Sequence, residues 1–344
     1  MHICIKHNTS TDNWSKMESF TSLSHRAQVR RLKHLAAAAL AEYDLPGARL
    51  APLVHAFNTT FQVTDAGGNR YALRITRPGK CTVTEVQSEL AWLVALHRDT
   101  DLVVPDPVPT RGGALLTVAG APGVPEPRIC ALFRWMPGRF VRAGLMPRHL
   151  EQVGRLMARL QDHAQGFQPP PGFTRPRIDD IPATRTTVVP LVARVRPPRD
   201  VALVEAALDR IAATLDGLGH SSDAYGLIHS DLHQWNYLFH HGQVHLLDFD
   251  DCGYAPFLYD LAVTTFEVEH EPHFPALRAA LLAGYGATRS LPPDPETALT
   301  TLTQLRRIQN LIWDISLQGD VYRRDHWQQI ITTGLDRLRA FMTG

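Results

Sequence analysis

Apolar side chains recur every three to four positions in several stretches of this chain, and this spacing predicts amphipathic helices. In residues 24–43 the apolar positions form one helical side, and Ser24 is placed to cap its start. Residues 84–97 show the same pattern, with Thr84 as the expected cap. Later stretches with the same periodicity cover residues 149–163, 201–218, 258–268, 275–285, 295–317 and 326–342.

Short stretches rich in β-branched and aromatic residues predict strands in the amino-terminal part of the chain. They cover residues 53–54, 61–64, 70–75, 115–118 and 128–133. The turn-forming sequence Asp-Ala-Gly-Gly-Asn at residues 65–69 separates the second strand from the third, so these two are expected to pair. Pro105, Pro107 and Pro109 mark a loop. Because strands precede and follow one helix, we expect a small antiparallel sheet with that helix packed against it.

These elements predict an α+β fold with two lobes. We expect residues 1–23 to form a disordered tail, 24–134 the amino lobe, 135–138 (Trp-Met-Pro-Gly) a hinge and 139–344 a mainly helical carboxy lobe. Within the second lobe, residues 169–200 are rich in proline and arginine and lack clear periodicity. This segment is therefore expected to be extended.

Composition narrows the possible partners. The chain has 344 residues, 44% hydrophobic and 20% charged, which predicts a packed globular core. The formal net charge of +1 gives no electrostatic argument for binding nucleic acid or an anionic membrane surface. No apolar run approaches the roughly 20 residues of a membrane-spanning helix. The four cysteines form no CxxC pair, and free thiols favour a reducing, cytoplasmic location.

The strongest chemical signal lies in two short segments, His-Ser-Asp-Leu-His-Gln-Trp-Asn at residues 229–236 and Leu-Asp-Phe-Asp-Asp at residues 247–251. Short strands predicted between them, with a turn at Gly242, would bring Asn236 and Asp248 to the same end of a hairpin. Amide and carboxylate oxygens bind a hard divalent cation. With Asp231 beside them to orient a hydroxyl, these residues predict magnesium-dependent phosphoryl transfer.

At these residues the chain resembles a known family. Asp231-x-x-x-x-Asn236 and Asp248-Phe249-Asp250 are similar to the catalytic and metal loops of the aminoglycoside phosphotransferase family. That family has a protein-kinase-like fold and includes antibiotic, choline and homoserine kinases and bacterial stress-response kinases. The resemblance covers roughly residues 53–285. It implies ATP and Mg²⁺ as cofactors and a small-molecule hydroxyl as acceptor, with Asp231 as catalytic base, Asn236 and Asp248 as metal ligands, and Asp250 as a further ligand candidate.

The resemblance also implies a nucleotide-binding set in the amino lobe. Its members are Asn58, Thr59, Thr60, Arg74, Glu89, Phe133 and Trp135. The first three correspond to the loop that covers the phosphates, and the last two border the adenine. Arg74 stands where the family usually has a lysine on the α- and β-phosphates, and Glu89 is its expected acidic partner, with Glu85 as the second choice. The chain departs from the family in this arginine, in Ser230, where glycine is usual, and in having no glycine-rich loop.

Several alternatives remain open at this stage. The departures at Arg74 and Ser230 also fit a catalytically weak ATP-binding regulator, and the family includes protein kinases of the stress-response type. His229, Asp231 and His233 alternate along the chain, which also fits a zinc-dependent hydrolase.

Other polar residues have simpler interpretations. Asp260 is expected to cap a helix or brace a loop. The acidic residues Glu267, Glu269 and Glu271 could bind a substrate amine or form a solvated helix end. Trp313, next to Asp314 on a late helix, could line the acceptor pocket, but we expect it to pack in the core.

Overall fold

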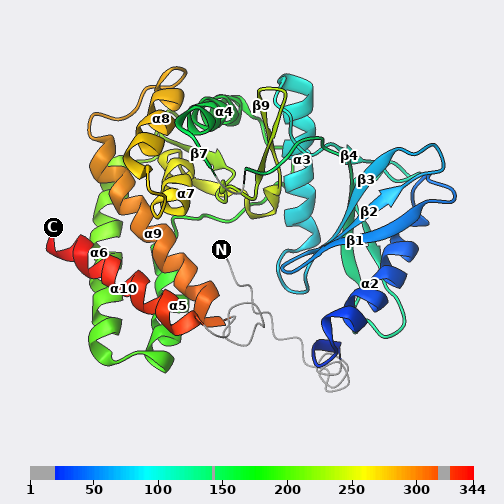
Figure 1. Cartoon of the computed structure of the whole chain (residues 1–344), viewed down its shortest axis with the longest axis horizontal. Helices are drawn as coiled ribbons and strands as arrows, with labels where there is room; N and C mark the ends of the chain where they lie inside the picture. Colours follow the sequence, from blue (N-terminus) through cyan, green and yellow to red (C-terminus); the bar gives the residue numbers. More distant parts are fainter. Residues whose placement is uncertain (1–19, 142–143, 317–325) are drawn as a thin grey trace.

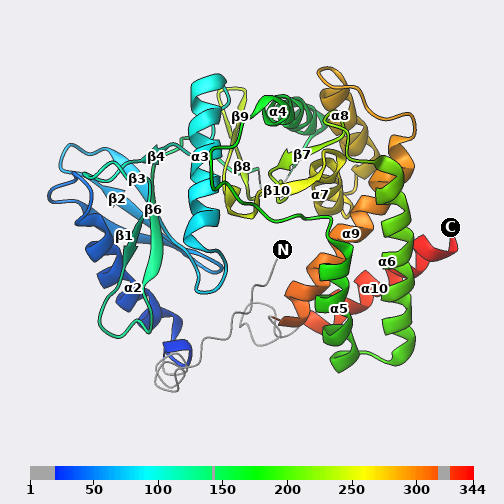
Figure 2. The ribbon, with the colours of Figure 1, turned by 180° about the vertical axis from the view of Figure 1, so that it is seen from behind.

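The computed structural model describes residues 20–141, 144–316 and 326–344, and it has two lobes (Figure 1). A sheet with two helices forms the amino lobe, and helices dominate the carboxy lobe. Helix α3 (Val83–Asp99) lies between the sheet and the carboxy lobe, as the reverse view also shows (Figure 2). Residues 1–19 of the predicted tail fall outside the described residues. The tail boundary predicted at residue 23 is wrong, because Phe20 is buried in the core of the amino lobe.

The sheet of the amino lobe is antiparallel, with the order β1-β2-β3-β6-β4 and with β5 also paired to β6. Its strands are β1 (Arg49–His55), β2 (Thr59–Thr64), β3 (Arg70–Ile75), β4 (Pro107–Val108), β5 (Thr117–Ala119) and β6 (Arg128–Arg134). The predicted pairing around residues 65–69 is confirmed. The proline segment predicted as a loop contains β4, because an edge strand tolerates proline, which has no N–H to donate.

Alternation along β6 gives the sheet two apolar faces. Cys130 and Leu132 pack with helix α2 (His25–Leu40), whereas Ala131 and Phe133 belong to the core that α3 shares with the carboxy lobe. The sheet is therefore covered on both sides, and α3 joins it to the second lobe.

Side-chain caps define where helices α2 and α3 begin. The prediction for α2 is confirmed, since the Ser24 hydroxyl accepts a hydrogen bond from the backbone N–H of Ala27. The prediction of Thr84 for α3 is wrong. Thr82 caps that helix, because its hydroxyl accepts a hydrogen bond from the backbone N–H of Glu85. The Glu85 carboxylate in turn accepts from the backbone N–H of Thr82, so two N–H groups at the start of the helix are satisfied. Glu85 is thereby used in the cap.

The carboxy lobe contains helices α4 (Pro147–Gly166), α5 (Ile181–Val195), α6 (Pro198–Leu218), α7 (Leu258–Val268), α8 (Phe274–Gly286), α9 (Pro295–Ser316) and α10 (Trp327–Thr343). Two antiparallel strand pairs, β7 (Tyr225–Ile228) with β10 (Gly253–Pro256) and β8 (Tyr237–His240) with β9 (Gln243–Leu246), lie beside them. All six helices predicted after residue 148 are present.

Helix α5 corrects the prediction that residues 169–200 are extended. Asp180 caps it through the backbone N–H of Ala183, and Ile181, Thr184, Val188 and Val192 are buried at helical spacing. Pro190 inside the helix and the run of β-branched residues hid this periodicity in the sequence.

Helices α4 and α8 pack unusually closely because glycines face each other across the contact. A Cβ at Gly284 would overlap the backbone carbonyl oxygen of Glu151, and one at Gly154 would overlap that of Leu281.

We expect Gly284→Ala to lower the free energy of unfolding by about 1–3 kcal/mol, because the helices must separate to admit a methyl group. Urea denaturation tests this. Gly286→Ala on the same helix is the matched control: nothing lies within 4 Å of its added Cβ, so it should be neutral or slightly stabilising. Equal effects of the two substitutions would contradict the packing argument.

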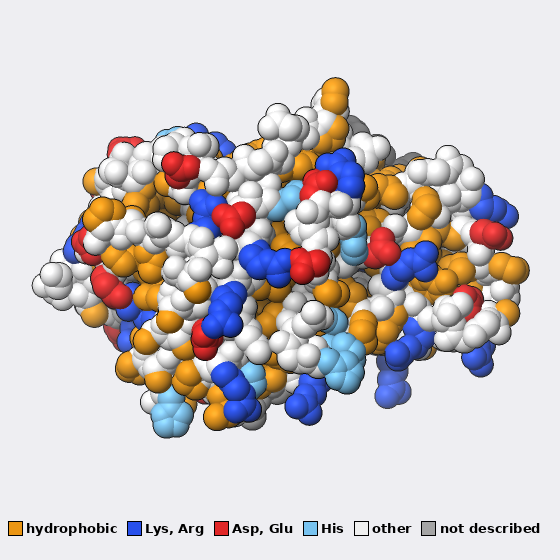
Figure 3. Space-filling view, turned by 90° about the horizontal axis from the view of Figure 1, so that it is seen from above, with side chains coloured by type: hydrophobic (Ala, Val, Ile, Leu, Met, Phe, Trp, Pro, Cys, Tyr) orange, Lys and Arg blue, Asp and Glu red, His pale blue; other side chains and the backbone are white. Residues whose placement is uncertain are grey.

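Figure 3 shows Lys, Arg and His side chains along the lower edge of one face, and side chains of both signs over its middle. The mixture of signs over the middle of this face is in keeping with the net charge of +1. Among the described residues, no helix combines the length and hydropathy needed to cross a bilayer.

Candidate active site

The loop that follows β7 carries Asp231, and buried polar contacts hold its backbone. Asp260 is fully buried and accepts hydrogen bonds from the backbone N–H groups of Ser230 at 2.7 Å and His229 at 3.3 Å. The ring of His229 lies 2.8 Å from the carbonyl oxygen of Leu247. Asp260 thus braces the loop, as predicted, and His229 has a structural role.

Ser230 adopts a left-handed backbone conformation, with φ of +66°. This conformation is costly for a residue other than glycine, asparagine or aspartate. The Ser230 hydroxyl donates to the carbonyl oxygen of Asp251 at 2.5 Å, which offsets part of that cost and ties the catalytic loop to the metal loop. Serine therefore supplies a contact that the glycine usual in the family would lack.

The hairpin β8–β9 brings Asn236 and the metal loop together. The backbone N–H of Leu247 donates to the carbonyl oxygen of Asn236 at 2.8 Å. Asp248, the next residue, therefore lies at the same end of the hairpin as Asn236. The Asn236 amide donates to the Asp231 carboxylate at 3.1 Å and to its backbone carbonyl at 2.9 Å. At the other end Gly242 has the predicted positive φ, of +79°. Asp231, Asn236 and Asp248 are thereby gathered at one end of the hairpin.

The Asp231 carboxylate also has a cationic partner that sequence analysis missed. Arg306, in the middle of α9, donates to Asp231 Oδ1 at 2.5 Å and lies 3.9 Å from Glu267. His233 Nε2 is 3.3 Å from Asp231 Oδ2. Although burial opposes ionisation, Arg306 and His233 hold the pKa of Asp231 well below its usual range. Asp231 is therefore ionised at neutral pH and oriented from two sides.

The sheet contributes a buried ion pair. Arg74 on β3 donates to both carboxylate oxygens of Glu89 on α3, at 2.7 and 2.6 Å. Phe133 lies beneath the guanidinium, 5.2 Å from ring centroid to Cζ, and Arg74 Nη1 is 4.0 Å from Asp248 Oδ1. The structure thus joins Arg74 to Glu89 and not to Glu85. Trp135 lies outside this cluster, and the Arg70 guanidinium stacks over its ring at 4.7 Å.

The connection between β1 and β2 reaches across to the carboxy lobe. Asn58 donates to Asp250 Oδ2 at 2.6 Å, and the Phe57 ring packs edge-on against Trp313 of α9, 4.6 Å between centroids. Trp313 is only partly buried, at this contact between the lobes. Thr59 and Thr60 lie within β2 instead of the loop. The hydroxyl of Thr59 is 2.7 Å from His55 Nδ1, so it has a partner inside the amino lobe.

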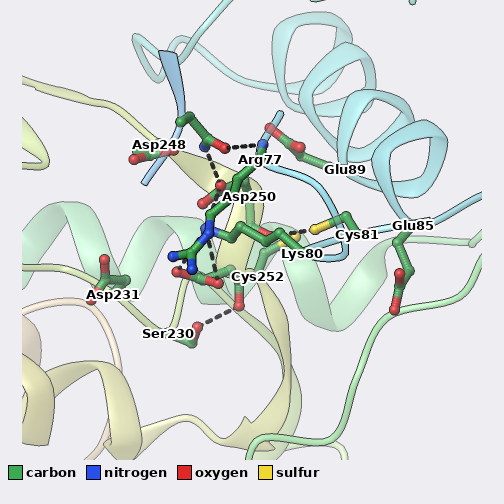
Figure 4. Close-up of polar contacts among 12 residues, drawn as sticks. Arg77, Lys80, Cys81, Glu85, Glu89, Ser230, Asp231, Asp248, Asp250 and Cys252 are labelled. Carbon is green, nitrogen blue, oxygen red and sulfur yellow. Dashed lines mark hydrogen bonds and ion pairs between the residues drawn. The ribbon is translucent and has the colours of Figure 1, made fainter. Parts of the chain in front are cut away.

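A second missed cation, Lys80, lies against the metal loop. Its ammonium is 2.6 Å from Asp250 Oδ2 and 3.5 Å from Asp251 Oδ1. Figure 4 shows the Lys80 side chain directed at Asp250, with Asp231 farther from this pair. Despite burial, Lys80 and Arg74 lower the pKa of Asp250. The sequence indicated such a cation only indirectly, because three aspartates within four positions require positive charges nearby.

The geometry does not favour the zinc alternative. The His229 ring is engaged with Leu247, and residues 20–141, 144–316 and 326–344 contain no group of three or more His, Cys, Asp or Glu that could hold a metal.

The acidic residues at the end of α7 are less solvated than expected, because Glu269 accepts a hydrogen bond from Arg307 at 2.7 Å.

Comparison with known proteins identifies relatives with the same architecture. A family model described as "Phosphotransferase enzyme family" matches residues 49–298. The solved structure of the microcompartment-associated aminopropanol kinase is 30% identical, with a TM-score of 0.76, and the match covers 88% of this chain and 94% of that one. The structure of amicoumacin kinase hAmiN in complex with AMP-PNP, Ca²⁺ and Ami is 21% identical, with a TM-score of 0.74 over 92% of this chain and 96% of that one, which shows the fold alone.

Amicoumacin kinase from Bacillus subtilis (strain 168) is 37% identical over 78 residues, and this match spans 23% of each chain. The solved structures confirm the predicted α+β fold with two kinase-like lobes. Because the family model matches well over half of the sequence, this chain belongs to the phosphotransferase enzyme family, as its catalytic and metal loops predicted.

Proposed function

We propose that this chain binds ATP with Mg²⁺ and transfers the γ-phosphate to a hydroxyl group of a small molecule. The observation that carries the proposal is the arrangement at the hairpin end. An ionised Asp231 is hydrogen-bonded to Asn236, and Asp248 lies just beyond the end of β9, 4.0 Å from Arg74. A base, two oxygen ligands and a phosphate-binding cation are the parts that kinase chemistry requires.

The side chains in the site fit a divalent cation. Arg74 is paired with Glu89 and Lys80 with Asp250, whereas the Asp248 carboxylate is 45% exposed. Asp248 and the Asn236 amide would hold Mg²⁺ through oxygen, the ligand type that this ion prefers. When bound, the ion would neutralise charge on the phosphates. The relative hAmiN was solved with AMP-PNP and Ca²⁺, which supports a nucleotide and a divalent cation as ligands here.

Five of the seven amino-lobe candidates have a role in the proposal, and Thr59 and Thr60, which lie within β2, have none. The Arg74 guanidinium would contact the α- and β-phosphates, while Glu89 keeps it charged and in place. Asn58 would cover the phosphates from the β1–β2 loop. Phe133 and Trp135, at the end of β6 and just beyond it, would border the adenine.

In the transfer step Asp231 would accept a hydrogen bond from the acceptor hydroxyl and take its proton. Its depressed pKa keeps the carboxylate charged, so it orients the hydroxyl over the whole physiological pH range. The resemblance to an aminopropanol kinase suggests small hydroxylated metabolites, amino alcohols among them, as acceptors. Free thiols at Cys81, Cys130 and Cys252 support a cytoplasmic location, where ATP is available.

A coupled ADP-release screen over amino alcohols, other hydroxylated metabolites, aminoglycosides and macrolides tests this function. An acceptor that stimulates ADP release from the wild type and not from Asp231→Asn would establish the reaction class. ATP binding without any stimulated release would instead favour a regulator. Label transferred to serine or threonine of a protein would favour a protein kinase.

Arg306 is expected to set the pH range of the reaction. Because this cation lowers the pKa of Asp231, Arg306→Met should raise that pKa and move the acid limb of kcat/KM to higher pH. The measurement is a pH–rate profile with an acceptor found in the screen. Arg306→Lys keeps the charge and should restore most of the wild-type profile. Arg307→Met, which removes a neighbouring arginine paired with Glu269, is the matched control and should leave the limb in place. An unshifted limb in Arg306→Met would contradict this role.

A further inference from the structure

Two aromatic rings from different lobes meet beside the active site. Phe57, in the connection between β1 and β2, packs edge-on against Trp313 of α9, with 4.6 Å between the ring centroids and 71° between the ring planes. Phe57 is 41% exposed, and Trp313 is only partly buried. Neither ring belongs to the two hydrophobic cores that the described residues form. The contact therefore lies outside the packing that holds each lobe together.

The loop that carries Phe57 is held over the metal loop by the next residue. The Asn58 amide donates to Asp250 Oδ2 at 2.6 Å, and its side-chain oxygen accepts from the backbone N–H of Arg77 at 3.2 Å. Asn58 is thus fixed by a contact in each lobe. In the proposed function this loop covers the phosphates, so Phe57 lies next to them on the side that faces α9.

Helix α9 connects the aromatic contact to the catalytic base. Arg306, which pairs with Asp231, and Trp313 are seven positions apart, so both lie on one side of the helix. Seven positions correspond to about 10 Å along the helix axis. A short stretch of this side of α9 therefore separates the base from the aromatic contact.

An acceptor molecule would lie under this contact. In the proposed transfer its hydroxyl is between Asp231 and the γ-phosphate, beneath the β1–β2 loop. The rest of the molecule then extends along the side of α9 that leads to Trp313. A long acceptor would have to separate the two rings and lift the loop that Asn58 holds, whereas a short one fits beneath them. Specificity arises when the wrong partner has to break such contacts.

We infer that Phe57 and Trp313 set the upper size limit of the acceptor, so that short hydroxylated molecules are phosphorylated in preference to aminoglycosides and macrolides. The inference rests on the proposed function, since it assumes that Asp231 and the covering loop enclose the transfer site. It gives Phe57, a residue of the nucleotide-binding lobe, a part in the choice of acceptor. It also places Trp313 at the acceptor pocket.

The test compares acceptors that share a reactive group and differ in length. The probes are 1-amino-2-alkanols and 1,2-alkanediols, each as the three-, six- and nine-carbon member, assayed by coupled ADP release beside aminoglycosides and macrolides. In the series that supports transfer, the wild type should favour the shortest member over the longest by at least about tenfold in kcat/KM. Phe57→Ala and Trp313→Ala should each bring this ratio to within about threefold, mainly by raising kcat/KM for the longest member.

Two further variants and one binding measurement separate acceptor size from general damage. Trp313→Phe keeps an aromatic ring and should retain most of the wild-type ratio. Phe341→Ala is the matched control, because it removes a partly buried phenyl ring on α10 that packs against Arg210. It should leave the ratio unchanged. The Kd for AMP-PNP, measured for every variant, should stay within about threefold of the wild type.

An unchanged ratio in both alanine variants would overturn the inference, as would a wild type that prefers an aminoglycoside or a macrolide to every short acceptor. Transfer to neither series would overturn it too, because the short members are the molecules that it admits. Each of these results leaves the proposed function standing as long as some acceptor is phosphorylated. AMP-PNP binding without transfer to any acceptor removes both, so the two failures are distinguishable.

Discussion

Asp231→Asn is expected to slow phosphoryl transfer by about 10²- to 10⁴-fold, the range typical of a removed general base. The asparagine keeps the shape of the side chain and can still accept from Arg306, but it cannot take the proton of the acceptor hydroxyl. Because Asp231 is proposed to contact the acceptor and not the nucleotide, the Kd for AMP-PNP should change by no more than about twofold. Single-turnover transfer from ATP and equilibrium binding of AMP-PNP measure the two effects separately.

Asp216→Asn is the matched control for this loss, because Asp216 is an exposed carboxylate on α6. It should leave both the transfer rate and nucleotide binding at wild-type values. A transfer rate in Asp231→Asn within about threefold of the wild type would remove Asp231 from the role of base. Loss of AMP-PNP binding together with the rate would instead indicate that the substitution damages the nucleotide site.

Glu89→Ala is expected to lower the free energy of unfolding by about 3–5 kcal/mol, the cost of leaving a buried charge without its partner. Arg74 would lose both bonds of its bidentate pair, and its side chain is 9% exposed, so water cannot replace them fully. The loss should appear as a lower urea midpoint with an unchanged m-value. Nucleotide affinity should fall too, because the guanidinium is no longer held in one orientation.

A double variant separates charge from packing. Arg74→Met with Glu89→Leu removes both charges and keeps apolar volume, so it should recover much of the stability that Glu89→Ala loses. Glu85→Ala, one helical turn earlier, is the control: it removes the capping box and should cost about 0.5–2 kcal/mol. A Glu89→Ala variant within about 1 kcal/mol of the wild type would show that Arg74 finds another partner or reaches solvent.

The contacts that the sequence predicted correctly are those set by local chain geometry. Asn236 and Asp248 lie at the same end of a tight hairpin with Gly242 at its turn, because the register of the two-stranded ladder fixes which residues its ends bring together. The family resemblance implied the pairing of Arg74 with Glu89, which are 15 positions apart, on β3 and on the helix that follows it after the connection of residues 76–82. Helix periodicity correctly predicted most of the carboxy lobe but missed α5, a continuous helix that contains Pro190.

Residue patterns along the chain were thus enough to identify the family, the two-lobed fold and the hairpin that gathers Asp231, Asn236 and Asp248. How the charges of these loops are balanced depends instead on contacts between segments that are distant in the chain. Arg306 is 75 positions from Asp231, and Asn58 is 192 positions from Asp250, so no local pattern links the partners. The physical reason is that an ion pair between distant segments forms only where whole elements pack. Helix α9 packs against the loop that carries Asp231, so Arg306 becomes the partner of that aspartate. The β3–α3 connection packs against the loop that carries Asp250, so Lys80 becomes its partner.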